Sequence, residues 1–216
     1  RSAQSRGMTL PEIAQLLKDM GAANALNLDG GGSSTMAARV AGADGPTVAN
    51  IPSDGHERAL PNSVMFYSTA PSTDLSDVQI SAAVDGADTV FPGLHRTFNA
   101  TGLASDLAPV MTKGTFGVGE NLELSQADSQ NAVVIGVSTG HSQVTYDVGP
   151  HHDSADLRVL GELRGLTPSE RSITLTDTAD QSHITLTGFD GDGRTAVIEN
   201  ADVTAEVSDG FELHSE

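Results

Sequence analysis

Residues 27–36 read Asn-Leu-Asp-Gly-Gly-Gly-Ser-Ser-Thr-Met, and this stretch decides how the first part of the chain is expected to fold. Residues 25–28, Ala-Leu-Asn-Leu, predict a buried strand that ends at Asp29. Three glycines let the backbone take positive φ and approach a ligand closely, and consecutive N–H groups can form an anion-binding nest. Asp29 could act there as a base, a nucleophile or a metal ligand. Hydroxyls that could bind a phosphate or a sugar follow at Ser33, Ser34 and Thr35.

A glycine run after a strand is also compatible with a tight turn that binds nothing, and both interpretations stay open for residues 30–32. No Lys follows the glycines, which excludes a Walker A phosphate loop. The G-x-G-x-x-G spacing of dinucleotide-binding loops is missing as well.

Working outward, the preceding segment predicts one amphipathic helix. Thr9 followed by Glu12 is a capping-box pattern, and Gly21 is expected to end the helix. Its apolar positions are 13, 16, 17 and 20, which repeat with helical spacing. Further strands are expected at residues 34–40 and 62–67.

A second polar cluster, residues 50–58, reads Asn-Ile-Pro-Ser-Asp-Gly-His-Glu-Arg. Its Pro-Ser-Asp-Gly core has strong turn chemistry, so a solvated surface turn is the plain interpretation. Arg58 permits a second interpretation, a phosphate-binding turn, because a guanidinium can hold a phosphate with two parallel hydrogen bonds.

These two clusters, with residues 5–14 (Ser-Arg-Gly-Met-Thr-Leu-Pro-Glu-Ile-Ala) before them, resemble the phosphodiester glycosidase family. The family pattern runs through a Thr-Leu-x-Glu-Leu-Ala helix, the glycine-rich segment and Asn-x-Pro-Ser-Asp-Gly-x-x-Arg, in this order. The resemblance covers residues 1 to about 68, and Arg1-Ser2 matches the end of an upstream family segment. It implies hydrolysis of a sugar-1-phosphodiester, in which the glycosidic bond breaks and the phosphate stays on the aglycone.

On this resemblance, we expect Asp29 to be the catalytic carboxylate, with Asp54 or Glu57 as its partner. The backbone of the glycine turn and Arg58 are expected to hold the phosphate. Neither a metal ion nor a cofactor is called for. The full set of expected substrate-binding residues is Asn27, Gly30, Gly31, Gly32, Ser33, Ser34, Thr35, Ser53 and Arg58.

Charge is spread unevenly over the 216 residues, whose formal net charge is −18. Residues 1–68 hold five basic and six acidic residues, so that −17 falls on the rest. This balance argues against nucleic acid or an anionic membrane surface as the main partner. The chain has no run of 18 apolar residues, and its lack of cysteine excludes disulfides and thiol catalysis.

The sequence after residue 72 predicts short strands separated by polar turns, a pattern typical of Ig-like β-sandwiches. A weak repeat relates residues 98–103 to residues 184–189. The predicted strands are residues 78–84, 97–101, 133–137, 143–148, 172–175, 183–187 and 203–207. The expected fold class is an α+β fragment of a glycosidase domain at 1–70, followed by all-β Ig-like sandwiches at 71–160 and, incomplete, at 161–216.

Two further motifs favour structural interpretations. His151-His152-Asp153 could bind a metal ion, but an exposed polar loop is favoured. Asp190-Gly191-Asp192-Gly193 resembles a calcium loop without its distant Glu, so a hairpin turn is favoured.

We expect this chain to be a piece of a longer bacterial protein that is extracellular or attached to the cell envelope, and to be inactive alone. Its expected substrate is a sugar-1-phosphodiester or a phosphorylated polysaccharide. The alternatives are a surface module whose glycine turn only binds an anion, and a cell-surface Ig-like adhesion or glycan-binding protein. The absence of Trp and the presence of only two Tyr weaken glycan binding.

Overall fold

The computed structural model describes residues 7–61, 63–71, 73–84, 87–177, 180–207 and 212. The chain divides into two compact units, Arg1–Thr69 and Ala70–Glu216. The Arg1-Ser2 match, the Ser5-Arg6 lead-in and Asn62, where a strand was expected to begin, lie outside the described residues.

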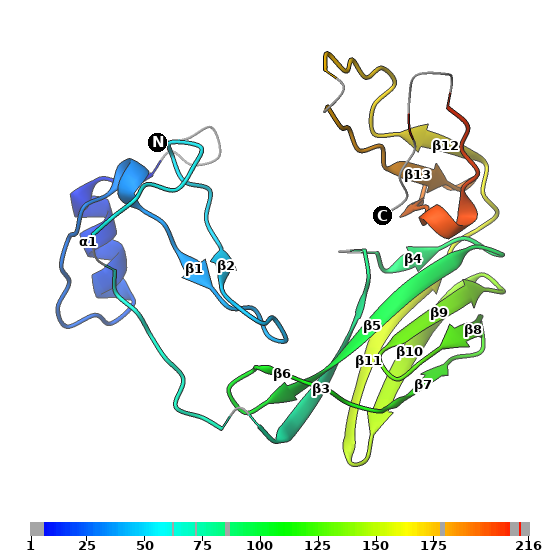
Figure 1. Ribbon diagram of the computed structural model, residues 1–216, viewed down its shortest axis with the longest axis horizontal. Helices are drawn as coiled ribbons and strands as arrows, with labels where there is room; N and C mark the ends of the chain where they lie inside the picture. The colour runs from blue at the N-terminus through cyan, green and yellow to red at the C-terminus, as the bar shows by residue number, and fades with distance from the viewer. Residues whose placement is uncertain are drawn as a thin grey trace. The chain divides into compact units, whose positions relative to one another are not determined.

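The first unit contains the expected helix, α1 (Leu10–Asp19), which is drawn in blue in Figure 1. The capping box is formed, because Thr9 Oγ1 accepts from the Glu12 amide at 3.4 Å and Glu12 Oε2 accepts from the Thr9 amide at 2.7 Å. Gly21, at φ +87°, follows the last turn in the left-handed region. The helix prediction and its boundaries are therefore confirmed.

No apolar core is found among the described residues of this unit. The only buried residues there are Gly32 and Ser33, and α1 has none. Residues 25–28 and 63–67, expected as strands, are not strands. The strand expected at 34–40 shrinks to β1 (Ala37–Ala38), which pairs with β2 (Thr47–Val48). Without neighbouring strands to accept their backbone hydrogen bonds, apolar runs alone do not make a sheet.

The predicted fold class is therefore wrong. The described residues are 37% strand and 8% helix and form several sheets. One ten-residue helix without a buried side chain and one pair of two-residue strands do not make an α+β core.

The second unit is built on two sheets packed face to face, drawn from green to yellow in Figure 1. One sheet has the order β3 (Leu75–Ala82), β5 (His95–Ala104), β9 (Asn131–Gly136), β8 (Leu122–Ala127), with β6 (Pro109–Val110) paired to β5. The other has the order β4 (Thr89–Val90), β11 (His151–Val159), β10 (Gly140–Val148), β7 (Thr115–Val118). All pairs are antiparallel except β4 with β11.

The core lies between the two sheets and takes every second residue of the central strands. Its buried members are Val78, Ile80, Val90, Phe98, Ala100, Phe116, Leu122, Ala132, Val134, Val144, Tyr146, Leu157 and Val159. The buried Tyr146 hydroxyl contacts Thr112 Oγ1 at 2.9 Å and donates to the Ser129 carbonyl at 2.6 Å. Burial of this phenol is therefore accompanied by satisfied hydrogen bonds.

A three-stranded antiparallel sheet of β12 (Gly165–Pro168), β13 (Leu186–Phe189) and β14 (Thr195–Val197) follows, and η2 (Asn200–Asp202) comes after it. A second apolar cluster attaches this sheet to the sandwich; its buried members are Phe91, Leu160, Ala196 and Ile198.

A buried ion pair supports this attachment. Arg96 of β5, 1% exposed, donates to Glu199 Oε1 at 3.2 Å and to the Val197 carbonyl at 2.7 Å. Burial lowers the pKa of Arg96, while the charge of Glu199 opposes the shift. The segment around η2 is thus held to the sandwich by charge as well as by apolar contact.

Several strand predictions overlap observed strands, and others do not. Those at 78–84, 97–101, 133–137, 143–148 and 183–187 overlap β3, β5, β9, β10 and β13. Those at 172–175 and 203–207 are wrong, and β11 was expected to begin as a loop. No helix among the described residues is long and apolar enough to cross a membrane.

Candidate functional site

The glycine segment forms one turn of 3-10 helix, η1 (Gly31–Ser33). Gly31 has φ +64°, which favours glycine. The Ser33 and Ser34 amides donate back to the Gly30 and Gly31 carbonyls at 3.3 and 3.1 Å. Among the described residues, the amides of Gly31 and Gly32 have no acceptor. The turn therefore offers two backbone donors, which is the part of a nest that an anion would use.

Asp29 lies at the start of this turn and is exposed. Its Oδ1 accepts from the Gly30 amide at 3.0 Å. The neighbouring Ser33 hydroxyl lowers the pKa of the Asp29 carboxyl most, and the Gly30 amide and the charge of Arg58 lower it further. Asp29 is thus ionised at neutral pH.

Ser33 joins the glycine turn to the second polar cluster of the sequence. Its Oγ accepts from Arg58 Nη1 at 3.1 Å. Ser33 is only 7% exposed. The two sequence clusters, 25 residues apart at these positions, therefore meet at one buried hydroxyl.

Arg58 also pairs with Asp54, whose Oδ2 accepts from Nη2 at 2.5 Å. The Asp54 carboxylate lies against Gly32, since a Cβ on that glycine would be 2.1 Å from Oδ2. Gly55, at φ +80°, closes the turn that carries Asp54, and its amide donates to the Pro52 carbonyl at 3.0 Å. We call Asp29, Gly32, Ser33, Asp54 and Arg58 the glycine-turn cluster.

Asn50 is a residue that the site prediction missed. Its Oδ1 accepts from the Met36 amide at 2.6 Å, and its Nδ2 donates to the Ser34 carbonyl at 2.9 Å. A carboxamide can satisfy a backbone donor and a backbone acceptor at once, which few side chains can do. The sequence feature that could have identified Asn50 is its position at the start of the second polar cluster.

Other expected site residues are not brought into the glycine-turn cluster. Glu57, Asn27, Thr35 and Ser53 are exposed, and within the described ranges no hydrogen bond or ion pair joins their side chains to it. The Ser34 carbonyl accepts from Asn50, which lies outside the cluster. The structure thus brings together Asp29, Ser33, Asp54 and Arg58 out of the wider set.

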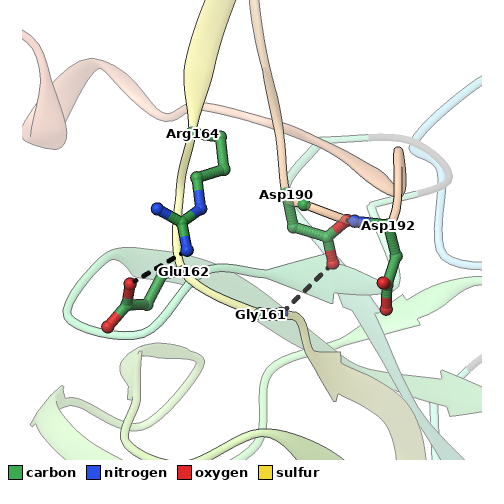
Figure 2. Close-up of a pocket in the computed structure, with 6 residues that line it drawn as sticks. Gly161, Glu162, Arg164, Asp190 and Asp192 are labelled. Atoms are coloured by element: carbon green, nitrogen blue, oxygen red, sulfur yellow. Dashed lines mark hydrogen bonds and ion pairs between the residues drawn. The ribbon is translucent and has the colours of Figure 1, made fainter.

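The second unit has an open hollow of about 250 Å³ between the segment that joins β11 to β12 and the β13–β14 turn (Figure 2). Asp190, only 3% exposed, accepts there from the amides of Gly161, Asp192 and Arg194 at 3.3, 2.9 and 2.9 Å. The Asp-Gly-Asp-Gly motif is therefore a hairpin turn, as favoured from the sequence. Within the described residues, no group of three or more His, Cys, Asp or Glu side chains is placed to hold a metal ion.

The expected polar loop at His151-His152-Asp153 is wrong, because these residues begin β11. His152 Nδ1 contacts Asp147 Oδ1 at 2.7 Å across the β10–β11 ladder. Asp153 Oδ2 accepts from the Ile80 amide of β3 at 2.9 Å, which links the two sheets. Pairing with β10 accounts for a strand that the polar sequence did not indicate.

Comparison with known proteins gives one family match. The family model described as phosphodiester glycosidase matches residues 1–67, the segment that carries the glycine-turn cluster. No curated protein matches this chain.

Among solved structures, three similar ones are of the surface-layer protein SbsC. Its domains 5–6 share 15% identity over 56% of this chain and 64% of theirs, with a TM-score of 0.36. Domains 4–9 share 17% over 63% of this chain and 23% of theirs, with a TM-score of 0.37. Domains 1–6 share 16% over 61% of this chain and 18% of theirs, with a TM-score of 0.39. The chain thus spans less than two thirds of each of these structures.

Proposed function

We propose that the glycine-turn cluster is part of the active site of a hydrolase that cleaves the glycosidic bond of sugar-1-phosphodiesters. The observation that carries the proposal is the contact of Arg58 with Ser33 of the glycine turn, which places a cation beside two backbone donors and the acid Asp29. The phosphodiester glycosidase match over residues 1–67 supports it. The proposed substrate is a phosphodiester-linked sugar of cell-envelope or extracellular glycans.

Asp29 is the proposed catalytic carboxylate. In the reaction, a water oxygen bonds to the anomeric carbon and the bond from that carbon to the phosphate oxygen breaks. The phosphate monoester leaves with the bonding electrons, and the proton of the water passes to a base. An ionised Asp29 suits this base role, or the stabilisation of the oxocarbenium-like transition state.

The low pKa of Asp29 also fits the leaving group. A phosphate monoester, with a second pKa of about 6, leaves as an anion and needs little help from a general acid. A carboxyl group whose pKa is raised, as glycosidases use to protonate an alkoxide leaving group, is therefore not required here.

Arg58 is the proposed phosphate ligand. Its guanidinium has five N–H donors, and its two contacts in the cluster use two of them. The side chain is 50% exposed, so the remaining donors can reach a diester held beside the Gly31 and Gly32 amides. Asp54 then orients Arg58. Asp54 or Glu57 is also the proposed second catalytic carboxylate.

The test is hydrolysis of an activated sugar-1-phosphodiester by the protein expressed from its complete reading frame. Asp29→Asn should lower kcat by roughly a hundredfold to ten-thousandfold, since the base is lost. Arg58→Lys should raise KM by about tenfold, because the point charge of an ammonium replaces a planar guanidinium that can donate two parallel hydrogen bonds. His56→Ala, an exposed change in the same loop, is the control and should leave both constants unchanged.

Near-wild-type turnover by Asp29→Asn would remove Asp29 from the mechanism. A second candidate function is adhesion or glycan binding at the cell surface through the β-sandwich of the second unit. It would replace the enzyme proposal if the wild type left every such diester intact while residues 70–216 bound polysaccharide. Either function fits the proposed place at a bacterial cell envelope, where such modules serve as spacers.

A further inference from the structure

We propose that residues 199–202, here called the η2 segment, fix the three-stranded sheet on the β-sandwich in a single orientation. They do so by placing two carboxylates against the backbone of β5 at the point where β3 no longer accompanies it. The proposal concerns the second unit alone and does not depend on the proposed enzyme activity. Two observations carry it: the open backbone edge of β5, and the spacing of the two acids that bond to this edge.

The first residues of β5 have a strand on one side only. β3 pairs with β5 as far as Ala82 opposite Phe98, and the Ala83 amide still donates to the Thr97 carbonyl at 2.8 Å. Within the described part of the chain, His95–Thr97 pair with β9 alone. The outward amides of this stretch therefore need acceptors from elsewhere, because an amide left unpaired at a buried edge is costly.

Two carboxylates of the η2 segment supply these acceptors. Asp202 Oδ2 accepts from the His95 amide at 2.8 Å, and Glu199 Oε1 accepts from the Thr97 amide at 2.7 Å. The second oxygen of each acid bonds the side chain of the same residue. Asp202 Oδ1 contacts His95 Nδ1 at 2.5 Å, and Glu199 Oε2 accepts from Thr97 Oγ1 at 2.7 Å. Both carboxylates are thus engaged through both oxygens.

The spacing of the two acids matches the repeat of the strand edge. Amides two residues apart on a strand are separated by about 7 Å along the strand, and three residues of 3-10 helix rise about 6 Å. Glu199 directly precedes η2, and Asp202 is its last residue. Neighbouring amides of a strand point to opposite sides, so a shift of the segment by one residue along β5 would leave both carboxylates without their donors.

Burial gives these bonds their weight in setting the orientation. The side chains of Asp202 and Glu199 are 5% and 10% exposed, and Arg96, which lies between the two bonded amides, is 1% exposed and also donates to Glu199. Opening this junction would leave two carboxylates and a guanidinium without their partners. The apolar cluster that attaches the sheet is non-directional. The hydrogen bonds of the η2 segment therefore decide the orientation, while the apolar contacts contribute to the strength of attachment.

The test is the distance between two spin labels in the 216-residue chain, measured by double electron–electron resonance. The sequence has no cysteine, so Glu123→Cys in β8 and Thr167→Cys in β12, both exposed, give one label on each part. We expect a single narrow distance distribution in this otherwise wild-type chain. Asp202→Ala should make the distribution roughly twofold broader or add a second distance, and hydrogen exchange at the His95 amide should become roughly tenfold faster.

Asp192→Ala is the matched control, because this acid lies in the same part of the chain but its side chain bonds Arg194 of its own turn. It should change neither readout. If Asp202→Ala failed to fold, as judged by circular dichroism, Thr97→Val would replace it; this change removes only the bond to Glu199 Oε2 and should broaden the distribution by a smaller amount.

An unchanged narrow distribution in a folded Asp202→Ala or Thr97→Val chain would overturn the proposal, because the apolar cluster alone would then set the orientation. A broad distribution in the chain that carries only the two labels would overturn it as well.

Discussion

The carboxylate of Asp54 occupies the space where a side chain on Gly32 would begin. A Cβ built on Gly32 would lie 2.1 Å from Asp54 Oδ2, far inside van der Waals contact. Arg58 holds that carboxylate in place from the other side at 2.5 Å. A side chain at this position would therefore have to displace the Asp54 carboxylate from its place against the turn.

Gly32→Ala should displace Asp54 from Gly32 and disturb its pairing with Arg58. We expect KM for a sugar-1-phosphodiester to rise by roughly tenfold, since the guanidinium loses its orienting partner. Gly45→Ala is the matched control, because a Cβ there meets nothing within 4 Å. In a background of Asp54→Ala the clash is gone, so Gly32→Ala should then have little further effect; an undiminished effect would show that the clash is not its cause.

Asn50→Ala should loosen the segment after the glycine turn. The Met36 amide loses its acceptor at 2.6 Å, and a hydrogen bond contributes about 1 kcal/mol. We expect hydrogen exchange at Met36 to become roughly fivefold faster. The Ile13 amide, which donates to Thr9 within α1, serves as the internal reference. Equal exchange at Met36 before and after the change would mean that Asn50 does not hold this segment.

Glu199→Gln should destabilise the second unit strongly. The change removes the paired counter-charge of the Arg96 guanidinium, which is 1% exposed, and breaking a buried pair typically costs about 3 kcal/mol or more. Urea unfolding followed by circular dichroism measures the loss. The control is Glu162→Gln, since Glu162 pairs with Arg164 at 3.7 Å on the surface and should contribute about 0.5 kcal/mol or less. Similar losses for both variants would contradict a buried, functional ion pair at this junction.

Asp190→Asn should show an effect that depends on pH. Burial acts to raise the pKa of Asp190, but the amides of Arg194, Gly161 and Asp192 outweigh it and leave the pKa lowered. A carboxyl whose folded pKa is depressed stabilises the protein above its unfolded pKa of about 3.9, and the contribution is lost as pH falls through the folded value. The variant should therefore unfold more easily than the wild type at neutral pH, and the difference should shrink below about pH 4.

Asp192→Asn is the control for the same turn, because that side chain is 70% exposed. Chemical unfolding at a series of pH values measures both variants. A difference between Asp190→Asn and the wild type that stayed constant down to strongly acidic pH would rule out the titration of this carboxyl as the cause.

Local signals predicted local structure well. The Thr9–Glu12 capping box and Gly21 set the ends of α1 by contacts within a few residues, so the sequence contained all that was needed. The alternating strands β3, β5 and β9 followed for the same reason, since one face of each is buried. β11 was missed because its first half is polar, and it is a strand because β10 pairs with it along nine residues.

Predictions that depended on contacts between distant parts of the chain were wrong or only partly correct. Residues 25–28 and 63–67 have strand-forming sequences, but no neighbouring strand among the described residues takes up their backbone hydrogen bonds. The prediction of an α+β fold class was wrong for the same reason, because it depended on these strands. For the candidate site, the residue types were predictable, while the contact of Arg58 with Ser33 was not, because it depends on how two distant loops meet.

By itself, the sequence determined the capped helix, the positions of the two polar clusters and the alternation that builds the sandwich, since each depends on short-range spacing and on which face is apolar. Tertiary structure alone decided that Asn50 holds the chain after the glycine turn, that the Asp54 carboxylate lies against Gly32, and that Arg96 is buried against Glu199. The physical reason is that hydrogen bonds and ion pairs between residues far apart in the chain depend on atomic positions to within fractions of an ångström. Residue spacing along the chain does not contain that information.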